Sequence, residues 1–176
     1  MLKRIKLQFK EPIIKKDLLK VLKTAFLYGL LYAFIFGLVF FFTEEINKFL
    51  GSFAINFITL FGIVIAHILS RKINENHSSG HIIYRLISVF AWLVSYWIMC
   101  SIGKTFNLFV NTSFSGGEMS WNQIGSFFNP LKSFNWIWTW YFLYNFEFVW
   151  FLNYVLGVLL FVYSIFVMYR YSSRLL

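Results

Sequence analysis

The chain has 176 residues, of which 59% are hydrophobic and only 13% are charged, and its mean hydropathy is +0.67. Soluble domains carry about 25% charged residues, so this composition excludes an ordinary water-soluble globular protein. The formal net charge of +9 would suit a nucleic-acid-binding protein, and the placement of the basic residues therefore decides between nucleic acid and membrane.

The N-terminal residues 1–23 form a basic segment that holds eight lysines and arginines. From residue 13 onward its apolar residues recur at helical spacing. The lysines expected on the opposite face are Lys15, Lys16, Lys20 and Lys23. This pattern predicts an amphipathic helix that lies on the inner leaflet, binds anionic lipid headgroups, and precedes a turn into the membrane. The segment lacks an aromatic platform and a known nucleic-acid module, which disfavours nucleic acid as the partner.

Four stretches without charged residues follow, each long enough to cross a bilayer as a helix. They are residues 24–43, 51–70, 86–103 and 148–169. Helices satisfy their own backbone hydrogen bonds in lipid, and the alternating pattern of a membrane β-barrel is missing. The sequence therefore predicts an all-α integral membrane protein with four transmembrane helices in one domain, residues 24–170. The first apolar run is too long for a cleaved signal peptide, so we expect it to be retained.

Small residues recur at intervals of four in the first two predicted spans, where they permit close helix contact. These rows are Gly29, Ala33 and Gly37 in the first span and Gly62, Ala66 and Ser70 in the second. Our hypothesis is that the two rows pack against each other or form an oligomer interface. In the fourth span, Asn153 is the polar group that most needs a partner, and a helix-packing hydrogen bond is favoured over a ligand site.

The connections differ in length and composition. A short turn is expected at residues 44–52, and residues 71–85 read as an exposed loop. The external connection, residues 104–147, is long and Trp-rich, and an uncharged aromatic segment occupies residues 133–146. Trp136, Trp138 and Trp140 in that segment favour the membrane interface, so a lipid anchor is preferred to a docking surface for a partner. Whether the segment is re-entrant, interfacial or part of a longer tilted fourth helix stays open.

The basic residues are distributed unevenly among these connections. Thirteen of the sixteen lie in the N-terminal segment, the 71–85 connection and the C-terminal end, whose tail is residues 171–176. Positive charge marks the cytoplasmic side of a membrane protein. We therefore expect both termini in the cytoplasm, and the inner (plasma) membrane of a bacterium is the default location.

Chemistry-bearing motifs are sparse. The sequence contains no catalytic serine or zinc-protease motif and no phosphate-binding glycine loop. His67 is the only ionisable residue inside a predicted span other than the Cys100 thiol and the tyrosines, so ion-coupled transport is disfavoured. His77 and His81 flank Ser-Ser-Gly, but further metal ligands are not evident. We expect no enzyme activity, no cofactor and no metal.

These observations favour a small polytopic membrane protein that acts as a non-catalytic membrane subunit or a homo-oligomeric scaffold in a larger complex. Its expected partners are the lipid bilayer, further copies of itself or other membrane subunits. The first alternative is a passive channel or membrane-perturbing effector, for example of a stress or anti-phage system. The second alternative is a small membrane enzyme or carrier.

Overall fold

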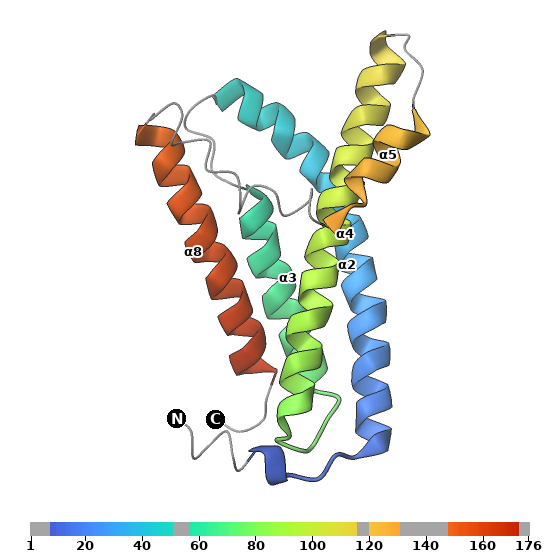
Figure 1. The fold of residues 1–176 in the computed structure, drawn as a ribbon, viewed down its shortest axis with the longest axis vertical. Coiled ribbons are helices and arrows are strands. Elements are labelled where there is room, and N and C mark those ends of the chain that lie inside the picture. Colours follow the sequence, from blue (N-terminus) through green and yellow to red (C-terminus); the bar gives the residue numbers. More distant parts are fainter. Residues whose placement is uncertain (1–7, 51–56, 116–119, 131–147, 173–176) are drawn as a thin grey trace.

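The computed structural model describes residues 8–50, 57–115, 120–130 and 148–172, and within these ranges the regular structure is helical, with no strand. Four long helices and one short helix are arranged as Figure 1 shows. They are α2 (Lys15–Leu50), α3 (Phe57–Asn74), α4 (Ile82–Ser115), α5 (Trp121–Phe127) and α8 (Phe148–Tyr171). Helix α2 packs mainly on α4, and α3 packs mainly on α8. The prediction of an all-helical protein is confirmed for these residues.

Three of the helices contain segments long and apolar enough to cross a membrane. These segments are Lys15–Val39 in α2, Ile82–Ser113 in α4 and Tyr154–Tyr171 in α8. Large apolar side chains project outward from each of them, such as Phe26 on α2, Phe90 on α4 and Leu159 on α8, which are 72%, 69% and 61% exposed. These outer surfaces are compatible with a lipid environment.

Helix α2 differs from the prediction at both of its ends. A separate interfacial helix was expected before the first span, but one unbroken helix of 36 residues begins at Lys15 and continues to Leu50. The expected turn at residues 44–52 is therefore helical as far as Leu50. The reason is local, because Pro12 precedes the helix and α2 contains no proline that would interrupt its hydrogen bonds. Figure 1 shows that the last part of α2 leans away from the axis of the earlier part.

Helix α4 also extends beyond its expected end at residue 103, because residues as far as Ser115 are helical rather than part of a loop. Its polar residues bond to their own helix. Thr105 Oγ1 donates to Ser101 O at 2.8 Å, and Ser113 Oγ donates to Phe109 O at 2.8 Å. Such bonds to the carbonyl four residues earlier let hydroxyl side chains stay within a helix. At 1.5 Å per residue, the 34 residues span about 50 Å, which exceeds a bilayer core of about 30 Å.

The short helix α5 returns against the projecting part of α4, as Figure 1 shows. The buried Ser101 Oγ lies 2.8 Å from Phe127 O at the end of α5 and 2.9 Å from Trp97 O in its own helix. Residues 104–115 and 121–127 of the expected external loop are therefore helical. The rest of the aromatic segment, including Trp136, Trp138 and Trp140, lies outside the described residues.

Trp92 of α4 lies at the centre of the bundle and is fully buried. Its Nε1 donates to Gly62 O of α3 at 2.8 Å, and its ring centroid lies 5.1 Å from that of Phe161 of α8. One side chain thus joins three helices. The surrounding hydroxyls of Ser88 and Ser164 are buried and donate to carbonyls of their own helices. The interior therefore accommodates small polar groups without unsatisfied donors at these positions.

Candidate functional site

Three segments that are distant in the sequence meet at one end of the bundle. They are the stretch before and at the start of α2, the connection between α3 and α4, and the end of α8, all of which lie at the lower end in Figure 1. We call this meeting point the terminal junction. It is defined by Pro12, Ile14, Asp17, His77, Ser78, Ser79, Tyr84 and Ser172. Helix start, connection and helix end are thus held together directly.

His77 is the central side chain of the terminal junction. It is only 3% exposed, and its ring stacks on the fully buried Tyr84 with a centroid separation of 4.6 Å and an interplanar angle of 6°. Its Nδ1 lies 2.8 Å from Ser79 O, and its Nε2 lies 2.6 Å from Ser172 O. One imidazole therefore links the connection after α3 to the end of α8.

Both partners of the His77 ring are backbone carbonyls, and carbonyl oxygens only accept hydrogen bonds. A neutral imidazole carries a single N–H, whereas the imidazolium carries two. The two short contacts together therefore require the doubly protonated ring. The position suits a cation, because the C-terminal end of α8 has a partial negative charge and histidine near such an end can bond the last carbonyls.

The start of the chain is attached to the same connection by side chains on both sides. Ser78 donates to Asp17 Oδ2 from its backbone N at 3.0 Å and from its Oγ at 2.8 Å. Ser79 Oγ donates to Pro12 O at 2.7 Å. The Tyr84 hydroxyl lies 3.3 Å from both the N and the O of Ile14 and can therefore accept from one and donate to the other. The connection expected to be an exposed loop is thus partly buried by these contacts.

The outer rim of the terminal junction is basic. Lys15, Lys16, Lys20 and Lys23 are exposed on the first turns of α2, and Arg71 is exposed near the end of α3. Arg71 and Lys72 both pair with Glu75, at 3.5 and 3.0 Å. The hydrogen bond from Lys72 Nζ holds the pKa of the Glu75 carboxyl below its usual value. The four lysines predicted to contact lipid therefore project from the same end as the buried junction, and nothing in the described structure places a ligand on them.

The small-residue rows are buried, and their glycines face α4. A Cβ built on Gly29 would lie 2.5 Å from Ser95 Oγ, and one on Gly37 would lie 2.9 Å from Ile102 Cβ. On α3, a Cβ at Gly62 would lie 3.0 Å from the Tyr96 ring. Ala33, Ala66 and Ser70 are also buried. The glycines of the two rows thus meet α4 as a common partner, whereas the sequence hypothesis had the rows meeting each other.

Other predicted site residues have less to report. The side chain of Asn153 lies outside the described residues, although its backbone belongs to α8. In the part of the chain that the structure describes, no group of three or more histidine, cysteine, aspartate or glutamate side chains is placed to hold a metal ion. His81 Nδ1 lies 3.1 Å from Ile83 N at the start of α4, which satisfies a backbone donor of that helix.

Sequence reasoning missed the role of His77 because both of its acceptors are backbone atoms, one of them 95 residues away. The sequence signal is therefore weak, and only the coincidence of a histidine with two serines near a basic helix end pointed toward this connection. The described fold defines an all-helical protein with three helices able to cross a membrane. No protein-family model, curated protein or solved structure matches the chain.

Proposed function

We propose that this chain is a polytopic membrane protein that acts as a non-catalytic membrane subunit or a homo-oligomeric scaffold within a larger complex. The observation that carries the proposal is the inverted polarity of the bundle. Large apolar side chains cover its outside, whereas small hydroxyl residues such as Ser88, Ser95 and Ser164 are buried inside. Lipid rewards this arrangement, because helices in a bilayer associate through small and polar residues rather than through an apolar core.

We further propose that α3 forms a fourth span. Helix α3 packs against α8, α2 and α4 and contains the apolar stretch from Leu60 to Leu69. With four spans the chain ends on the side where it begins, in agreement with the hydrogen bonds that join both ends of the described chain to the 75–81 connection. The basic rim assigns that side to the cytoplasm by the positive-inside rule.

The orientation gives a direct prediction with single cysteines in a Cys100→Ala background, where the natural buried thiol is removed. Glu75→Cys and Asn122→Cys place thiols at exposed positions near opposite ends of α4. A membrane-impermeant maleimide added to intact cells should label position 122, and position 75 only after permeabilisation. Labelling of both positions from the same side would contradict four spans with cytoplasmic ends.

The subunit or scaffold role is tested by purifying the tagged full chain in mild detergent and measuring its mass. We expect either a fixed multiple of 21.0 kDa, which identifies a homo-oligomer, or foreign subunits in constant stoichiometry. A chain that remains a single 21.0 kDa copy without stoichiometric partners at several detergent concentrations would contradict the proposal. Ion flux through liposomes containing the purified protein would then favour the passive channel.

A further inference from the structure

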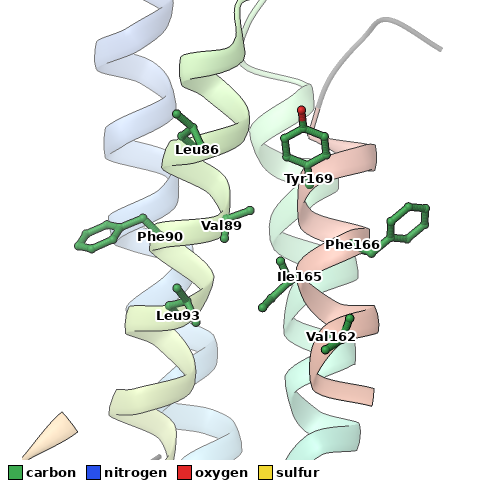
Figure 2. Close-up of a pocket in the computed structure, with 8 residues that line it drawn as sticks. All are labelled: Leu86, Val89, Phe90, Leu93, Val162, Ile165, Phe166 and Tyr169. Carbon is green, nitrogen blue, oxygen red and sulfur yellow. The ribbon is translucent and has the colours of Figure 1, made fainter. Parts of the chain in front are cut away.

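An open groove of about 480 Å³ runs between α4 and α8 on the outside of the bundle. Figure 2 shows Val89, Leu93 and Ile165 lying between the two helices, with Phe90 and Phe166 pointing outward on either side. The lining is almost entirely apolar, and Phe90 and Phe166 are 69% and 49% exposed. The described helices therefore leave this apolar channel open to the surroundings.

One end of the groove carries positive charge. Leu86 and Tyr169 line that end, which is also the end of the terminal junction. The guanidinium carbon of Arg85 lies 4.8 Å from the centroid of the Tyr169 ring, and that of Arg170 lies 5.7 Å from the centroid of the Phe166 ring. Two cations are thus held by rings that line the groove, at the level where the proposed cytoplasmic membrane surface lies.

We propose that this groove binds one acidic phospholipid, with an acyl chain along the apolar channel and the headgroup phosphate at Arg85 and Arg170. The inference rests on the proposed membrane location. Guanidinium groups match phosphate oxygens with paired donors, and stacking on a ring engages the flat face of a guanidinium whereas phosphate binding engages its edge. Basic recesses between membrane helices on the cytoplasmic side are a known setting for anionic headgroups.

The division of the groove into an apolar length and a basic end selects this occupant. A partner helix or a second copy would need complementary apolar side chains along the whole groove but no anion at its end. A zwitterionic lipid would fill the channel without matching the two positive charges. Among the described residues no carboxylate is paired with Arg170, so an anion from outside the described chain suits that position.

The test uses the full chain, extracted from membranes in mild detergent and given equal amounts of phosphatidylglycerol and phosphatidylcholine. Bound lipids are counted by native mass spectrometry. The wild type should retain about one phosphatidylglycerol per chain, with a preference over phosphatidylcholine of about tenfold or more, as two arginines near a headgroup imply. Arg85→Gln with Arg170→Gln should reduce the preference to about twofold or less. The exposed Arg170→Gln alone should reduce it partly without endangering the fold.

Matched controls separate this groove from other basic and apolar surfaces. Lys15→Gln with Lys16→Gln removes two exposed charges from α2, and Leu27→Trp enlarges an exposed apolar residue on α2. Both should leave the preference unchanged, whereas Leu93→Trp should fill the channel and abolish retention. Equal retention in the wild type and the double arginine variant would overturn the proposal, as would loss of retention only in the lysine variant.

Two further outcomes would identify a different occupant and overturn the lipid. Inorganic phosphate that stabilises the wild type and Leu93→Trp alike, as phosphatidylglycerol does, would mean an anion site that does not use the channel. A change in oligomeric mass in Leu93→Trp without a change in lipid retention would mean a protein interface. If the chain were not a membrane protein at all, it would be missing from the membrane fraction, which is scored before any lipid is counted.

Discussion

Replacing His77 with phenylalanine should lower the free energy of unfolding in detergent by about 3 kcal/mol, because two hydrogen bonds from a charged donor are lost in a buried site. The substitution keeps an aromatic ring beside Tyr84, so the stacking area is largely retained. The loss is confined to the carbonyls of Ser79 and Ser172, which would be left without their ring donors. Thermal unfolding gives the stability change, and hydrogen exchange should show faster exchange near Ser172.

The matched control is His67→Phe on α3. His67 is exposed, and its ring lies 6.0 Å from that of Tyr171 and 6.4 Å from that of Tyr163. Its replacement should change stability by about 0.5 kcal/mol or less, as is usual for surface positions. Equal melting temperatures for His77→Phe and the wild type would show that the terminal junction does not hold the helix ends together.

The protonation requirement adds a second readout of the same contacts. Deprotonation of the His77 ring would leave one N–H for two carbonyl acceptors, so conditions alkaline enough to remove that proton should speed exchange around Ser79 and Ser172. Asp17, whose carboxylate accepts from Ser78 beside the ring, is the acidic side chain of the terminal junction. In His77→Phe the ring cannot titrate, so the alkaline effect should disappear.

Apolar run length and the positions of lysine and arginine were sufficient to predict membrane-length helices, because both signals are carried by side-chain chemistry alone. Helix ends were not predictable in the same way. Thr105, Asn107, Asn111 and Ser113 have the composition of a loop, yet in α4 their side chains bond within the helix itself. A polar residue that satisfies itself on its own helix gives no sign in the sequence that the helix continues.

The terminal junction could be anticipated only in outline. The charge distribution placed the two chain ends and the 71–85 connection on one side, and hydrogen bonds join residues of these three segments. The sequence could not reveal that His77 and Ser79 are buried, because their partners are backbone carbonyls of distant residues. Contacts with main-chain atoms leave no complementary residue type to recognise.

Substituting alanine for Gly37 should be strongly destabilising, because the small-residue rows mark contact faces whose partner only the structure supplies. The added Cβ would lie 2.9 Å from Ile102 Cβ and 3.1 Å from Met99 O, and neither atom is the flexible end of a side chain. Helices α2 and α4 must therefore separate, at a cost of about 1–3 kcal/mol for overpacking. Gly125→Ala is the control, since a Cβ there meets no atom within 4 Å. It should be neutral or stabilise α5 by about 0.5–1 kcal/mol. Thermal unfolding of both variants in one detergent distinguishes the steric effect from any general effect of replacing a helical glycine. A Gly37→Ala protein as stable as the wild type would contradict the close α2–α4 contact.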